Sequence, residues 1–129
     1  MTENEIGTRI IEAAIEVHRA LGPGLLESVY EQVLAYELES RGLRVSRQVA
    51  IDINYRDTSF KGAFRADLIV EGKVIVELNS VEDLHRSHRK QLQTYLRLTA
   101  MRLGYILNFG EPLMKEGIVR AVNGLPETR

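Results

Sequence analysis

The sequence has no cysteine, only three prolines, and no apolar run near the roughly 18 residues that cross a membrane. Disulfide bridges and thiolate chemistry are therefore excluded, and the composition fits a reducing compartment, so we expect the cytoplasm and no membrane partner. The N-terminus has no basic stretch followed by an apolar one, so we expect no secretory signal. The net charge is −1, so nucleic acid could bind only through a local basic patch.

The length and composition are those of a globular protein. Hydrophobic residues make up 44% and charged residues 27% of the chain, and the glycines and prolines are scattered, without a linker or a repeat. A chain of 129 residues is long enough for one hydrophobic core and too short for two ordinary domains. We therefore predict a single domain over residues 1–129.

Helical periodicity dominates the first third of the chain. Residues 5–21 carry apolar side chains at helical spacing, and the following Gly22, Pro23 and Gly24 end the predicted helix. A second helix is predicted over residues 25–41. Its expected inner face consists of Leu26, Val29, Tyr30, Val33 and Glu37.

The period then changes to two, which is typical of strands. Residues 45–55 predict a half-buried strand whose apolar side holds Val45, Arg47, Val49, Ile51, Ile53 and Tyr55. Further strands are predicted over residues 60–70, 74–79 and 103–109, with a helix over residues 81–100, whereas residues 113–122 fit a strand or a helix. The order ααβββαβ predicts an α/β fold of the α+β kind, with a mixed sheet flanked by helices.

Two acidic residues, Asp67 and Glu77, lie in otherwise apolar strands, where a carboxylate is costly unless it is paired or binds a metal ion. With a three-residue loop over residues 71–73, Asp67 lies opposite Glu77, with Cβ atoms roughly 5 Å apart. Carboxylates at that spacing can hold Mg²⁺ or Mn²⁺. A two-residue turn would point them to opposite faces. In the three-residue register Arg65 and Asn79 join the cluster. The alternative to a metal is an ion pair of Asp67 with Arg65 or another arginine, with Glu77 at a solvated strand end.

Six short blocks resemble one protein family in their order along nearly the whole chain. They are Gly22-Pro23-Gly24-Leu25-Leu26-Glu27 (continuing Ser28-Val29-Tyr30), Tyr36-Glu37-Leu38, Gly42-Leu43, Arg65-Ala66-Asp67-Leu68, Val74-Ile75-Val76-Glu77-Leu78 and Gln91-Leu92-Gln93-Thr94-Tyr95-Leu96. This pattern resembles the GxxExxY family, which is similar to PD-(D/E)XK nucleases. The resemblance implies a PD-(D/E)XK nuclease-like core αβββαβ with an extra N-terminal helix.

The resemblance also implies a site for phosphodiester hydrolysis. Asp67 matches the central metal-binding acid, Glu77 the second acid, and Glu27 the acid of the first core helix, which binds metal directly or through water. Gln91 and Tyr95 match a Gln-x-x-x-Tyr motif that borders the site. The implied cofactor is Mg²⁺ or Mn²⁺, and the implied partner is nucleic acid.

The sequence departs from the family pattern at Asn79, which stands where the pattern has a lysine. Asparagine can orient a water molecule but carries no charge, and a lost contact of this kind lowers the rate by a factor of about 10² to 10³. Arg65 is placed to supply positive charge. We favour the interpretation that it only neutralises the acids, because arginine is a poor proton acceptor.

The helix predicted over residues 81–100 carries further basic residues. Arg86 and Lys90 fall on its outer side, where they could contact phosphates or simply form a solvated face, which we favour. His88 falls on the apolar side and is expected to be a hydrogen-bonded core residue. No cysteine or third clustered histidine accompanies His85 and His88, so no zinc site is expected.

Three hypotheses for the function remain open from the sequence. The first is a metal-dependent nuclease-like enzyme, weakened by Asn79. The second is a catalytically silent module that keeps the fold and binds nucleic acid or a protein. The third is a structural homo-oligomer.

Overall fold

The computed structural model describes residues 1–126, which form three α-helices, a 3₁₀ helix and a five-stranded sheet. In chain order the elements are α1 (Glu3–Leu21), α2 (Glu27–Ser40), β1 (Val45–Tyr55), β2 (Thr58–Val70), β3 (Val74–Asn79), α3 (Arg86–Thr99), β4 (Leu103–Asn108), η1 (Met114–Gly117) and β5 (Ile118–Val122). Within residues 1–126, no helix is long and apolar enough to span a lipid bilayer.

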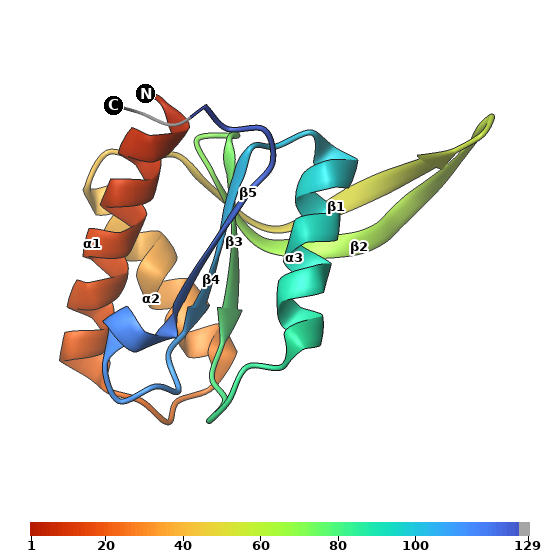
Figure 1. Ribbon diagram of the computed structural model, residues 1–129. Coiled ribbons are helices and arrows are strands. Elements are labelled where there is room, and N and C mark those ends of the chain that lie inside the picture. The colour runs from red at the N-terminus through yellow and green to blue at the C-terminus, as the bar shows by residue number, and fades with distance from the viewer. Residues whose placement is uncertain (127–129) are drawn as a thin grey trace.

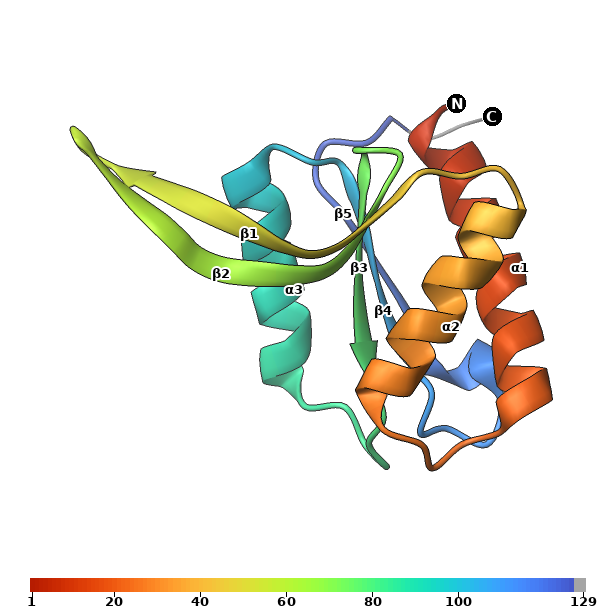
Figure 2. The same ribbon diagram turned by 180° about the vertical axis from the view of Figure 1, so that it is seen from behind.

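The sheet is mixed, with the strand order β1-β2-β3-β4-β5 and a parallel pairing of β3 with β4. Helices α1 and α2 cover one face of this sheet and α3 covers the other (Figure 1). Seen from behind, β1 and β2 form a long hairpin that extends past α3 and away from the body (Figure 2). The predicted mixed sheet flanked by helices, with an extra N-terminal helix, is therefore confirmed.

Helix α1 follows its sequence pattern closely. A capping box fixes its start, because the Glu5 N–H donates to the Thr2 hydroxyl and the Thr2 N–H donates to the Glu5 carboxylate. The apolar positions of the pattern are buried, among them Ile6, Ile10 and Val17. The helix begins two residues earlier than predicted because the capping box formed by Thr2 and Glu5 starts it at Glu3.

Helix α2 presents a different face to the core than the sequence analysis predicted. Its buried apolar residues are Tyr30, Leu34, Ala35 and Leu38, whereas Leu26 is 75% exposed. Tyr30 sets this orientation, because its ring stacks on Phe109 at 4.4 Å and its hydroxyl donates to the Gly22 carbonyl oxygen. The predicted inner face through Leu26 and Val29 is therefore wrong.

The apolar stripe of β1 also changes face, which simple alternation does not predict. Val45 packs in the core beneath α1 and α2, whereas Val49 and Ile51 pack in the core beneath α3. The change occurs at Gln48, whose φ of +49° lies in the left-handed region. The pairs Arg47 with Leu68 and Val49 with Ala66 keep the same register on either side of Gln48, and the register shift of this hairpin lies further along, between Ile51 and Ile53.

The start of α3 differs from the sequence expectation, and the structure settles the ambiguous segment 113–122. Helix α3 begins at Arg86 instead of residue 81, because the buried Asn108 amide binds both backbone groups of Val81. Residues 81–85 therefore form a connection, not a helical turn. The ambiguous segment 113–122 contains both η1 and β5, and β5 pairs antiparallel with β4.

Candidate functional site: two facing carboxylates on the β2–β3 hairpin

Asp67 and Glu77 face one another across the β2–β3 hairpin. The pairs Val70 with Val74 and Leu68 with Val76 fix the register that the three-residue loop predicts. The Asp67 N–H donates to Glu77 Oε2 at 3.0 Å, and the Leu78 N–H donates to Asp67 Oδ2 at 2.8 Å. Backbone groups of each strand thus hold the carboxylate of the other, and the two acids are brought together as predicted.

The pair is electrostatically unbalanced. Burial, and then the negative charge of Asp67, raise the pKa of Glu77 from its ordinary value of 4.5 to about 8. Within the described residues neither acid forms an ion pair with a lysine or an arginine. Two hard carboxylates that lack a positive partner are the donor set that Mg²⁺ and Mn²⁺ prefer.

A cavity of about 280 Å³ opens over this pair. Its lining combines residues of α2, β2, β3, α3 and β4: Glu27, Arg65, Asp67, Glu77, Leu78, Asn79, His88, Gln91, Tyr95 and Ile106. Seven of the predicted site residues therefore share one cavity. Arg86 and Lys90 do not line it, and both are exposed on α3.

Glu27 lies at the edge of this cavity, at the first residue of α2, and it is exposed. Within residues 1–126, no three histidine, cysteine, aspartate or glutamate side chains are grouped closely enough to hold a metal ion. The structure therefore brings Asp67 and Glu77 together without bringing Glu27 into the same coordination group. A metal ion would have two carboxylates as direct protein ligands, and Glu27 would have to act through water.

Asn79 ends β3 at the rim of the same cavity. Its backbone oxygen accepts the Phe109 N–H at 2.8 Å, which ties the strand end to β4. Its side chain lines the cavity where a lysine would supply a charge. Arg65 also lines the cavity and is exposed, but in the part of the chain that the structure describes it pairs with no carboxylate. Within the described residues no ion pair carries the expected neutralisation of the acids by Arg65, which stays a prediction, and its guanidinium is open to a ligand.

Tyr95 and Gln91 reach the cavity from α3. The Tyr95 ring stacks on Phe64 of the hairpin, with centroids 3.8 Å apart, so the aromatic pair fixes the ring at the cavity wall. Burial raises the pKa of the Tyr95 hydroxyl, and the charges of Glu77 and Asp67 add to this effect. The hydroxyl therefore stays protonated at neutral pH and can donate a hydrogen bond.

His88 is the cavity residue that the sequence analysis placed wrongly. It is half-buried and lines the cavity instead of filling the core. Its Nδ1 accepts the His85 N–H at 3.0 Å, so a proton of the neutral ring sits on Nε2. The prediction that His88 lies on the inner side of its helix gave the correct side of α3, and the cavity lining shows that this side borders the site at His88.

Three further residues near Asp67 were missed because no motif marks them. The Gln48 amide donates to Asp67 Oδ1 at 3.3 Å and to Glu31 Oε1 at 2.5 Å. Glu31 is buried and pairs with Arg47. A helical wheel puts Glu31 one turn after Glu27, but nothing in the sequence shows that Gln48 of β1 reaches it.

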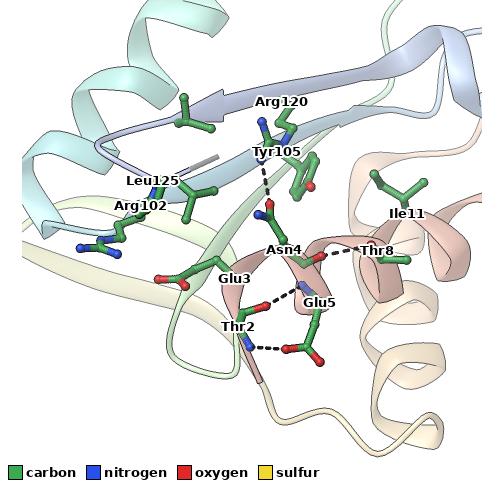
Figure 3. Close-up of a pocket in the computed structure, with 12 residues that line it drawn as sticks. Thr2, Glu3, Asn4, Glu5, Thr8, Ile11, Arg102, Tyr105, Arg120 and Leu125 are labelled. Carbon is green, nitrogen blue, oxygen red and sulfur yellow. Dashed lines mark hydrogen bonds between the residues drawn. The ribbon is translucent and has the colours of Figure 1, made fainter. Parts of the chain in front are cut away.

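A larger cavity, of about 1090 Å³, lies elsewhere, between the start of α1 and strands β4 and β5 (Figure 3). Several of its polar groups hydrogen-bond to one another. The Thr2 N–H donates to Glu5 at 3.0 Å and thereby lowers the pKa of the Glu5 carboxyl, and Arg120 donates to Asn4 at 2.9 Å (Figure 3). The carboxylate pair that the sequence analysis singled out lies in the smaller cavity and not in this one.

Comparison with known protein families gives one match. The model of a family described as the PD-(D/E)XK nuclease superfamily matches residues 4–121. The searches of curated proteins and of solved structures give no match. The matched range contains every residue that lines the cavity.

Proposed function

The chain belongs to the PD-(D/E)XK nuclease superfamily, and on this premise we propose that it is a weak, divalent-metal-dependent phosphodiester hydrolase of the GxxExxY branch. Family membership supports a nuclease-like function at the level of the superfamily. The metal dependence, the substrate and the activity are the proposal.

One observation carries the proposal: Asp67 and Glu77 face each other over a polar cavity without a cationic partner among the described residues. A purely structural acid pair would be expected to recruit a lysine or an arginine, or to be replaced by apolar residues of similar size. Arg65 lines the same cavity without pairing with either acid. This arrangement leaves the charge compensation to a proton on Glu77 or to a bound cation, which would displace that proton.

Each cavity residue then has a role that its chemistry allows. Asp67 and Glu77 would hold Mg²⁺ or Mn²⁺, with Glu27 acting through water. The bound ion would lower the pKa of the attacking water and offset charge on the phosphate. Arg65 would bind a phosphate oxygen as a charged donor.

The remaining cavity residues would orient the reactants. The Asn79 amide would position a water molecule without adding charge, and Gln91 and Tyr95 would supply hydrogen bonds at the cavity wall. Arg86 and Lys90 lie outside the cavity, so we propose for them only a contact with a longer nucleic acid.

Asn79 favours a second candidate function. Without the motif lysine, the same residues could bind a metal ion and nucleic acid, or a protein partner, without turnover. The variant Asn79→Lys separates the two candidates. A weakened enzyme should gain rate toward the factor of about 10² to 10³ expected for a charged or orienting contact. A silent module should gain metal-dependent affinity for nucleic acid and no rate.

The decisive experiment is a cleavage assay on single- and double-stranded DNA and RNA, with Mn²⁺ or Mg²⁺ and with a chelator. Wild-type protein should cleave at least one substrate slowly, and Asp67→Ala and Glu77→Ala should abolish that cleavage. Cleavage that survives both substitutions would come from a contaminant. If wild type and Asn79→Lys are both inactive while nucleic acid still binds, the silent module is correct.

The cellular setting is also a proposal. The cysteine-free composition supports the cytoplasm. A homo-oligomer, which the sequence analysis kept open, would be tested by the mass of the protein in solution.

A further inference from the structure

Gln48 places its side-chain amide between two carboxylates. Its Nε2 donates to Glu31 Oε1 at 2.5 Å and to Asp67 Oδ1 at 3.3 Å. The other oxygen of Asp67, Oδ2, accepts the Leu78 N–H at 2.8 Å. Each oxygen of the Asp67 carboxylate is therefore held by a donor from a different neighbouring strand, and together these two donors fix the carboxylate plane.

The backbone of Gln48 is strained. Its φ is +49°, in the left-handed region where glycine is the favoured residue and side chains with a Cβ are disfavoured. It sits between the regular pairs Arg47 with Leu68 and Val49 with Ala66. A residue needed only for this backbone conformation of β1 would be glycine, because glycine reaches this conformation without a steric cost. The presence of glutamine points to a use for its side chain.

Glu31 anchors the far side of the amide. Its side chain is 9% exposed, its Oε2 accepts the Arg47 Nε–H at 3.1 Å, and the same oxygen lies 3.0 Å from Arg47 Nη2 in an ion pair. A buried carboxylate held by a charge-assisted hydrogen bond is a well-fixed acceptor. Gln48 thus links Asp67 to a rigid group on α2.

We propose that Gln48 is a positioning residue for the Asp67 carboxylate, and that Glu31 and Arg47 hold the Gln48 amide in place. This inference rests on the proposed divalent-cation site. By fixing the carboxylate plane, the amide keeps Asp67 turned toward the cation it shares with Glu77, so that less side-chain freedom is lost on binding. Partners of this kind change metal affinity by about 10- to 100-fold when they are removed.

The test measures Mn²⁺ affinity by calorimetry and the thermal midpoint of the metal-free protein, for wild type and two variants. Gln48→Gly removes the amide and relieves the left-handed strain. Gln48→Asn keeps an amide and tolerates this backbone conformation, but it is one methylene too short to reach both acids. Both should bind Mn²⁺ about 10-fold more weakly. The midpoint of Gln48→Gly should stay close to that of wild type, because relief of the left-handed backbone strain offsets part of the cost of the two lost hydrogen bonds.

Two controls separate positioning from a general effect. Gln93→Asn shortens an amide of α3 that lies outside the cavity lining and donates to the Val122 carbonyl oxygen of β5, and it should leave Mn²⁺ affinity unchanged. Glu31→Gln should weaken Mn²⁺ binding by itself and have no further effect in Gln48→Gly, since the two residues act as one unit.

The outcomes are distinct. If Gln48→Gly binds Mn²⁺ as tightly as wild type, the positioning role is refuted and the metal site stands. If Gln48→Gly loses affinity and its midpoint falls by a similar amount to that of a core variant, the residue is structural and the proposal also fails. If wild type binds no Mn²⁺, the proposed function and this inference fail together.

Discussion

Replacing Glu77 with glutamine should make the metal-free protein more stable above neutral pH. Glu77 is buried next to Asp67, and its pKa is raised from 4.5 to about 8. The folded state therefore holds this proton more tightly than the unfolded state. The resulting stability is present below pH 4.5 and is lost as the pH rises through about 8. Glu77→Gln removes the ionisation and keeps an oxygen that accepts the Asp67 N–H.

The size of the effect follows from the shift. The difference between 4.5 and about 8, at about 1.4 kcal/mol per pH unit, corresponds to roughly 3 to 5 kcal/mol. For a chain of this length, the thermal midpoint at pH 8.5 should therefore rise by about 10 °C or more in Glu77→Gln. Urea unfolding from pH 4 to pH 9, in the presence of a chelator, measures the free energy of unfolding as a function of pH for wild type and for Glu77→Gln.

Glu71 provides a control, because its pKa is shifted in the opposite direction from that of Glu77. The Arg44 N–H hydrogen bond lowers the pKa of this half-buried carboxyl, so Glu71→Gln should leave the slope of stability between pH 5 and pH 8 unchanged. If Glu77→Gln keeps the wild-type slope, or is less stable than wild type at pH 8.5, the acids are not an unbalanced pair and the reasoning is refuted. Saturating Mn²⁺ should abolish the loss of stability that wild type shows as the pH rises, because the cation binds the ionised acids.

Three other substitutions test separate parts of the structure. Arg65→Gln should weaken nucleic-acid binding and lower its salt slope by about one while leaving Mn²⁺ affinity unchanged, and an unchanged salt slope would exclude a phosphate contact. Asn108→Ala leaves both backbone groups of Val81 and the Gly110 N–H without their partner. It should lower the free energy of unfolding by about 3 kcal/mol, and a loss below about 1 kcal/mol in urea titrations would show that the loop repacks. Tyr30→Phe removes the hydroxyl contact with Gly22 and should destabilise by about 1 kcal/mol, whereas no change would mean that ring stacking alone orients α2.

The sequence predicted the parts of the fold that depend on local periodicity and loop length. The register of β2 and β3 followed from the three-residue loop, and that register brought Asp67 and Glu77 together. The same register placed Asn79 beside them, the family resemblance supplied Glu27, Gln91 and Tyr95, and all of these residues line one cavity. Membership of the PD-(D/E)XK superfamily is confirmed at that level.

The sequence did not predict features that arise from tertiary contacts. The face of α2 depends on a stack between Tyr30 and Phe109, two residues far apart in the chain. The late start of α3 depends on the Asn108 amide, which overrides helical propensity at Val81. The left-handed Gln48 carries no sequence signal, because glutamine is not a residue that marks such a conformation. Its links to Glu31 and Asp67 could therefore be found only from the structure.

Calorimetric titration of the metal-free protein with Mn²⁺, alongside Asp67→Ala and Glu77→Ala, tests the central claim most directly. The account predicts that wild type binds Mn²⁺ at a single class of site and that either substitution abolishes binding, because the two carboxylates are the direct ligands that the geometry offers. Wild-type protein that binds no Mn²⁺, or that binds it equally well without Asp67 and Glu77, would contradict the account.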